Sequence, residues 1–211
     1  MRHGSFPRAW GALQEAVHSL DDAQWVAPSG CAGWLVQDLV FHLIIGAQDI
    51  LITLVTTTDA PATRDAVTYW EPGEPGDGTE AESVFVRRAA VAYSGPTSLT
   101  HHFDDLAVAA GKAAAAADPA ARVETRDEVL TVADYLTTYV VEATLHHLDL
   151  TLHLSGVDGP PASTLAATRA VVEGVAGRPL PSEDDREALL YATGRLPAPP
   201  SWAGFEPVAL G

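Results

Sequence analysis

The amino-acid sequence predicts an all-α protein, built as a bundle of four main helices with a short helical C-terminal extension. Apolar residues recur at helical spacing through several long segments, and no segment shows the convincing alternation of a strand. The 211 residues fit one domain with a small appendage. We expect a helical bundle over residues 1–155, and an extension and tail over residues 156–211 packed on that bundle.

The first two predicted helices have different patterns. Residues 6–20 place Trp10, Leu13 and Val17 on one stripe. A turn-rich segment, APSGCAG, separates them from a long apolar helix over residues 34–57. The second half of that helix, ILITLVTTT, is rich in β-branched residues and could be a strand. We favour a helix because the apolar pattern continues without a Gly or Pro stop.

The remaining predicted helices are separated by breaks rich in Pro, Gly and acidic residues. YWEPGEPGDGT forms a loop, SGP separates the next two helices, and DPAARVETRDEV closes the second of them. SGVDGPP ends the following helix, and a Pro-rich tail ends the chain. These helices are expected over residues 80–93, 98–117, 131–154, 163–175 and 182–191.

Composition excludes several functional classes. With 47% hydrophobic and 19% charged residues, the chain is a folded protein. A net charge of −16 argues against a general partner of nucleic acids or anionic membranes. The single cysteine, Cys31, allows no internal disulfide, and the N-terminus lacks the apolar core of a signal peptide. We therefore expect a cytoplasmic protein, and we interpret the apolar stretch LVFHLIIGAQDILITLV as a buried helix.

Ionisable residues gather in an otherwise apolar stretch, VVEATLHHLDLTLHL. Glu142 and His146 lie one helical turn apart on one face, and Asp149 and His153 continue the same stripe. His147 points about 100° away. A buried charge needs a partner, and a metal ion could satisfy several of these groups at once. A carboxylate and an imidazole four residues apart can converge on one divalent ion.

A third ligand must come from another helix, and His42 is the best candidate. It lies in the apolar helix over residues 34–57, with Asp38, Gly46 and Asp49 along its stripe. Glycine inside a helix costs roughly 1 kcal/mol relative to alanine, so the open volume at Gly46 could have a use. Helical bundles form metal sites in their cores from ligand side chains that project from facing helices.

Three segments resemble one known family. CAGWLVQDLVFH resembles the Cys-Pro-Gly-Trp-Thr-Val-Arg-Asp-Leu-x-x-His segment of the mycothiol-dependent maleylpyruvate isomerase N-terminal domain family, whose members are DinB-like metal-binding bundles. VVEATLHHLDL is similar to its second signature, Val-Val-Glu-x-x-x-His-x-x-Asp-Leu. ATGR, at residues 192–195, resembles a C-terminal signature of these proteins. The resemblance implies a DinB-like four-helix bundle in which His42, Glu142 and His146 bind a metal.

The implied metal is usually zinc, although nickel and iron(II) accept the same ligands. Three protein ligands leave a position open for water, thiol or substrate, which is typical of a catalytic site. The chain departs from the family pattern at Ala32, Leu35 and Gln37, where the family has Pro, Thr or Ser, and Arg. Only about 55 residues follow the metal-binding helix, too few for the additional α/β domain of the founding isomerases.

Other residues receive weaker assignments. Asp149 and Asp38 are expected to support the ligand imidazoles, because a carboxylate that accepts the second ring N–H fixes the tautomer. The alternatives are a carboxylate on the helix surface for Asp149 and a favourable charge in the first helical turn for Asp38. Gly46, Tyr135, Tyr139 and His153 are candidates for lining the pocket, with ordinary core or surface positions as the alternative. His101 and Asp105 form a rival metal pair without a partner motif. Cys31 could be a nucleophile or a ligand, but a small buried residue is the simpler interpretation, and we assign no side-chain nucleophile.

The leading functional hypothesis is a metal-dependent thiol enzyme, either a mycothiol-dependent isomerase or an S-transferase that acts on a small electrophile. Mycothiol would be the co-substrate, since a metal ion deprotonates a coordinated thiol. One alternative is a hydrolase that uses metal-activated water. Another is a non-catalytic metal-binding DinB-like module. The expected partners are a small thiol and its electrophile, without nucleic acid or membrane, in a monomer or homodimer.

Overall fold

A computed structural model of the protein describes residues 4–73 and 76–210. These residues form eight α-helices, one short 3-10 helix and one two-stranded hairpin. The mostly helical fold predicted from the sequence is therefore confirmed. In chain order the elements are α1 Ser5–His18, α2 Asp22–Trp25, α3 Val36–Val55, α4 Ala81–Ala90, α5 Pro96–Ala116, β1 Arg122–Thr125, β2 Glu128–Thr131, α6 Val132–Thr151, α7 Ala162–Ala176, α8 Asp185–Ala192 and η1 Pro200–Trp202.

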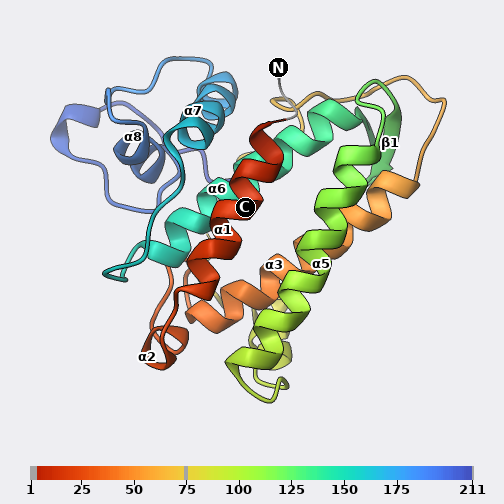
Figure 1. The fold of residues 1–211 in the computed structure, drawn as a ribbon. Helices are drawn as coiled ribbons and strands as arrows, with labels where there is room; N and C mark the ends of the chain where they lie inside the picture. The colour runs from red at the N-terminus through yellow and green to blue at the C-terminus, as the bar shows by residue number, and fades with distance from the viewer. Residues whose placement is uncertain (1–3, 74–75, 211) are drawn as a thin grey trace.

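The four long helices α1, α3, α5 and α6 surround the main core. Helix α3 packs on α5 and α6, and α1 packs on the same two helices. Figure 1 shows α7 and α8 on one side of this group, with α5 on the opposite side. Leu13, Leu39, Ile50, Phe103 and Tyr135 are fully buried where the four helices meet. This arrangement brings α3 and α6, which carry the predicted ligands, into contact.

Helix α3 is continuous through its β-branched second half, which confirms the helical interpretation. Of the described helices, α3 has the length and apolar composition that a membrane span would need. Its residues Leu39, Val40, Ala47 and Ile50 are completely buried against neighbouring helices. The helix begins without a side-chain cap from Leu35, the position where the family has Thr or Ser.

A β-hairpin between α5 and α6 corrects the expectation that no strand would form. Strands β1 and β2 are antiparallel, with Val123 opposite Leu130, and both side chains are fully buried. The two turn residues, Arg126 and Asp127, have φ angles of 48° and 63°. Positive φ at both central residues is typical of the turns that match strand twist in two-residue hairpins. The β-branched residues Val123, Thr125, Val129 and Thr131 around this turn were the available signal.

The C-terminal residues form a second core on the opposite face of α6. Val141, Leu145 and Leu148 of α6 pack with Val172 of α7 and Leu189 of α8. Helix α6 therefore buries apolar side chains against the long helices on one side and against the extension on the other. The short helices α2 and η1 were not expected from the sequence, and the division at residue 155 stays a prediction.

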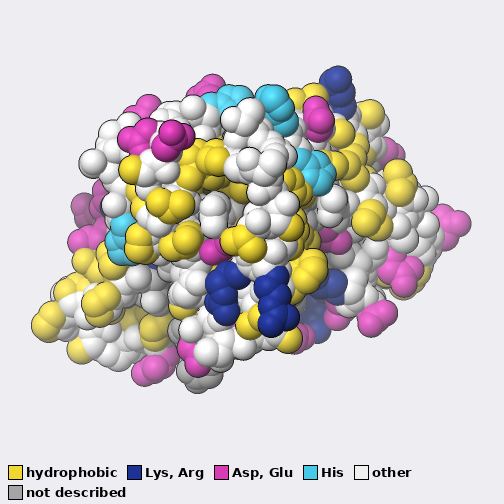
Figure 2. All heavy atoms as spheres, turned by 90° about the horizontal axis from the view of Figure 1, so that it is seen from below, with side chains coloured by type: hydrophobic (Ala, Val, Ile, Leu, Met, Phe, Trp, Pro, Cys, Tyr) yellow, Lys and Arg dark blue, Asp and Glu magenta, His cyan; other side chains and the backbone are white. Residues whose placement is uncertain are grey.

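Charge is unevenly spread over the surface. Figure 2 shows one face of the molecule, on which acidic side chains are scattered widely whereas basic side chains gather in a few places. The excess of acidic residues accounts for the net charge of −16.

Candidate metal centre

The structure brings His42 of α3 together with Glu142 and His146 of α6. Their possible ligand atoms all lie within 4.8 Å of one another. The two imidazole rings lie 4.8 Å apart at an angle of 77°. Nε2 of His146 lies 3.2 Å from Oε2 of Glu142. Residues a hundred positions apart in the chain thus meet at one point, as the spacing and the family resemblance predicted, and their role as ligands stays a prediction.

Two ring nitrogens at this point have no hydrogen-bond partner among the described residues. They are Nδ1 of His42 and Nε2 of His146, and both are buried. Glu142 is close to the second of them but is not aligned for a hydrogen bond. A buried polar atom without a partner costs about 1–3 kcal/mol. Two imidazoles and one carboxylate suit zinc, nickel or iron(II), so the residues fit the metal that the resemblance implies.

Electrostatics at the centre favour a cation. Burial, with His146 nearby, lowers the pKa of His42 to about 4, which leaves its imidazole neutral and able to bind a metal. Burial opposes ionisation of Glu142, but His146, His42 and Arg126 outweigh it and lower its pKa. Burial also opposes a charge on His146, but Asp149, Cys31 and Glu142 raise its pKa well above the usual value. The ionised carboxylate of Glu142 thus favours a cation at the point where the three side chains meet.

Asp149 supports His146 from the next turn of α6. Its Oδ2 lies 3.2 Å from Nδ1 of His146, and a proton held on Nδ1 leaves the lone pair of Nε2 free for a metal. Nε and Nη2 of Arg195 donate to the two carboxylate oxygens, both at 2.9 Å. Burial alone would raise the pKa of Asp149, but Arg195 and His146 lower it to about 2. The predicted support of a ligand imidazole by Asp149 is consistent with these contacts.

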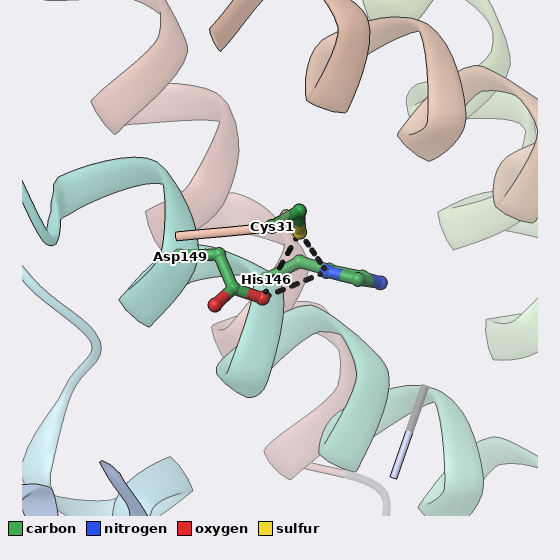
Figure 3. A group of neighbouring side chains, drawn as sticks. All are labelled: Cys31, His146 and Asp149. Carbon is green, nitrogen blue, oxygen red and sulfur yellow. Dashed lines mark hydrogen bonds and ion pairs between the residues drawn. The ribbon is translucent and has the colours of Figure 1, made fainter. Parts of the chain in front are cut away.

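Cys31 forms a second group of possible ligands with His146 and Asp149 (Figure 3). Its Sγ lies 3.4 Å from Oδ2 of Asp149 and 3.9 Å from Nδ1 of His146. The guanidinium of Arg195 already occupies Asp149 and would repel a second cation there. Burial and the charge of Asp149 raise the pKa of the Cys31 thiol, which therefore stays protonated at neutral pH and donates to Asp149.

A cleft leads from the surface to the imidazoles. Its volume is about 490 Å³, and its walls include His42, His146, Cys31, Trp34 and Arg195. Trp34 packs against His42 with 5.1 Å between ring centroids. Glu80, Glu82 and Ser83 also line the cleft. A small molecule entering this space would reach the open side of the candidate centre.

Asp38, a predicted support, and Gly46, a predicted pocket-lining position, both make other contacts in the structure. The carboxylate of Asp38 accepts the backbone N–H of Leu35 at 2.9 Å and so pairs the residue that precedes the first turn of α3. Asp38 therefore acts on the helix end and makes no hydrogen bond with His42 in the described structure. A Cβ at Gly46 would meet the ring of Tyr139 at 3.5 Å, so that ring fills the space that the glycine leaves.

The tyrosines and His153 also lie outside the walls of the cleft. Tyr135 and Tyr139 donate hydrogen bonds to Oδ2 of Asp49 at 3.4 Å and 2.6 Å, because this carboxylate interrupts an apolar helix and needs partners. His153 is exposed just beyond the end of α6. His147 points away from the centre, as expected, and its Nε2 donates to the carbonyl of Asp158 at 2.8 Å.

The rival pair, His101 and Asp105, lies on the exposed side of α5 and belongs to neither candidate metal group in the described residues. Arg195 is the contributor that sequence reasoning missed. Arg195 lies in the ATGR motif, but the motif alone does not indicate that its arginine contacts the carboxylate of Asp149, 46 residues earlier in the chain.

Fold and site together define a class of mostly helical proteins with a candidate metal centre between two core helices. The chain matches the family described as "Mycothiol maleylpyruvate isomerase N-terminal domain" over residues 6–151, and it belongs to this family. The matched region runs from α1 to the end of α6 and leaves α7, α8 and the tail outside. The family is related to mycothiol and associated with metal binding. No curated protein and no solved structure gave a significant match.

Proposed function

We propose that this protein is a metal-dependent enzyme that uses a small thiol, mycothiol, to attack an electrophilic substrate. The observation that carries the proposal is the meeting of His42, Glu142 and His146, whose two imidazoles line a cleft of about 490 Å³. The four long helices would serve as the DinB-like bundle that holds the ion, most commonly zinc. The proposed setting is the cytoplasm, where thiols stay reduced.

In this proposal His42, Glu142 and His146 hold the ion, and Asp149 keeps the proton on Nδ1 of His146. A bound divalent ion would supply a thiolate at neutral pH by lowering the pKa of the thiol. Trp34 and the turn that carries Cys31 form part of the wall of the cleft beside the two imidazoles. No side chain of this protein needs to act as the nucleophile.

The fate of the adduct distinguishes two reactions. In isomerisation, sulfur bonds to one carbon of an activated double bond, and the electron pair of that double bond moves into the activating carbonyl group. The former double bond, now single, rotates, and return of the electron pair then breaks the C–S bond. The thiol is regenerated, and the substrate changes from cis to trans. In S-transfer the C–S bond is kept, and the neighbouring carbon takes up the proton that the thiol released. Both reactions need only the thiol and the electrophile as small-molecule partners.

Metal analysis of the purified protein tests the first part of this proposal. We expect stoichiometric zinc, nickel or iron in the wild type and little in a His42→Ala/His146→Ala double variant. The matched control is His101→Ala, which removes an exposed imidazole from α5 and should leave metal content unchanged. Equal metal content in the wild type and the double variant would contradict the proposal.

Turnover tests the second part. The metal-loaded protein is given an activated alkene such as maleylpyruvate, with and without mycothiol, and product is followed by chromatography. Product that requires both the thiol and the metal supports the thiol mechanism. Hydrolysis that proceeds without thiol would support the water-activating alternative. Tight metal binding without any turnover would support the non-catalytic module.

A further inference from the structure

Arg195 connects the C-terminal extension to the candidate metal centre. It follows α8, where Gly194 has a φ of 73° and ends the helix in a conformation that glycine adopts most readily. The backbone N–H of Leu196 donates to the carbonyl of Leu190 at 3.0 Å, and Oγ1 of Thr193 donates to the carbonyl of Leu189 at 2.6 Å. This turn at the end of α8 directs the arginine side chain toward α6.

The contact between Arg195 and Asp149 is buried and fixed in geometry. Two guanidinium nitrogens reach the two carboxylate oxygens at 2.9 Å each, and the side chains are 10% and 1% exposed. Paired hydrogen bonds of this kind set the orientation of the carboxylate as well as its charge. Oδ1 of Asp149 has Arg195 as its hydrogen-bond partner, whereas Oδ2 is shared with His146 and Cys31.

Asp149 is held on its other side by the loop before α3. The N–H of Gly30 donates to the backbone carbonyl of Asp149 at 2.8 Å. A Cβ at Gly30 would lie 2.6 Å from Oδ1 of Asp149 and 2.8 Å from its Cα, so no larger residue fits there. The carboxylate therefore lies between the loop, the extension and His146, and Arg195 is the cation that meets it.

We propose that Arg195 is a positioning residue: through Asp149 it holds the ring of His146 in the orientation that binds the metal. The inference rests on the proposed metal centre. It assigns to the extension, which lies outside the matched family region, a part in completing that centre. Without Arg195, Asp149 would be a buried carboxylate lacking its main partner, and it would turn toward other donors and release the imidazole.

The test compares metal affinity in Arg195→Met and Arg195→Lys with the wild type, by competition for Zn²⁺ against a chelator. We expect Arg195→Met to bind zinc about 10–100-fold more weakly, as is typical when a partner of a ligand imidazole is lost. Arg195→Lys keeps the charge without the paired hydrogen bonds, so its zinc affinity should lie between those of the wild type and Arg195→Met. The visible absorption spectrum of the Co²⁺-loaded protein should change in Arg195→Met, because it reports ligand geometry directly.

Arg169→Met is the matched control. Arg169 also lies in the extension, is largely buried, and donates to Glu173 and Asp185 at 2.9 and 3.0 Å. Its loss should lower the melting temperature and leave zinc affinity and the Co²⁺ spectrum unchanged. A role of Arg195 in stability alone would make the two variants behave alike, and that result would overturn the inference.

A double-variant cycle keeps the test decisive if Arg195→Met folds poorly. Asp149→Asn alone and Asp149→Asn/Arg195→Met together should lose the same zinc affinity, because Arg195 acts through Asp149. Fully additive losses would overturn the inference. Equal zinc affinity in the wild type and Arg195→Met would also overturn the inference, but it would leave the proposed function standing. A wild type that binds no divalent metal would overturn both.

Discussion

Gly30 holds the loop before α3 against the backbone of α6. Its N–H donates to the carbonyl of Asp149, and the space where a side chain would start is taken by the atoms of Asp149. The function of this position is therefore close approach of two backbones, which only glycine permits. At the scale of single residues, the centre depends on such contacts as much as on its ligands.

We predict that Gly30→Ala destabilises the protein by about 1–3 kcal/mol, because overpacking a closely packed position costs this much. The free energy of unfolding in urea measures the effect. Gly111→Ala in α5 is the control, since a Cβ there meets no atom within 4 Å. It should stabilise the helix by roughly 0.5–1 kcal/mol. Equal stability of Gly30→Ala and the wild type would mean that the loop moves freely away from Asp149.

At the scale of the element, the hairpin β1–β2 prepares the start of α6. The strands end at Thr131, whose Oγ1 accepts the N–H of Asp134 at 3.0 Å and caps the helix that carries Glu142 and His146. The turn that joins the strands places two residues other than glycine in the left-handed region, which is unfavourable for L-residues. The turn therefore lowers the free energy of unfolding, and a glycine at one of these two positions should remove part of that loss.

We predict that Asp127→Gly raises the free energy of unfolding by roughly 1 kcal/mol, because glycine adopts positive φ without steric conflict. Thermal unfolding followed by circular dichroism measures the change. Glu124→Gly, in the exposed middle of β1, should instead lower stability by roughly 0.5–1 kcal/mol, since glycine weakens a strand. The prediction is wrong if both glycine variants shift stability in the same direction.

At the scale of the whole molecule, α6 joins two cores and the candidate centre. Its apolar residues pack against the long helices and against the extension, and its polar residues face His42 and Arg195. A ligand that binds the folded state alone stabilises the fold. Metal bound between α3 and α6 should therefore stabilise the molecule as a unit.

We predict that zinc at about 100 times its dissociation constant adds roughly 2.7 kcal/mol to the free energy of unfolding. For a chain of this length that corresponds to a rise in melting temperature of about 5–10 °C. The His42→Ala/His146→Ala variant should show little rise, and Mg²⁺ should have little effect on either protein, since it prefers oxygen ligands. The same zinc-induced rise in the double variant would place the metal elsewhere.

Sequence patterns predicted the long helices and the meeting of His42, Glu142 and His146. The helices and the pairing of Glu142 with His146 depend on spacing within one helix. The addition of His42 depends on the motif in which it lies. The β-branched residues of RVET and EVLT favour strands, but segments this short could not be distinguished from a loop. The tyrosine contacts of Asp49 were not predicted, because helical spacing states which face a residue occupies but not which neighbour fills the space beside it.

Helical periodicity suffices for the helical character of the chain. The resemblance of its motifs to one family suffices for the family and for the three candidate ligands, because those motifs can be recognised in the sequence itself. Only the tertiary structure decided three other features. Arg195 pairs with Asp149, Asp38 accepts the N–H of Leu35 at the start of α3, and the ring of Tyr139 fills the space beside Gly46. They depend on where separate elements are placed in space, and that placement results from the packing of both cores around α6 at once.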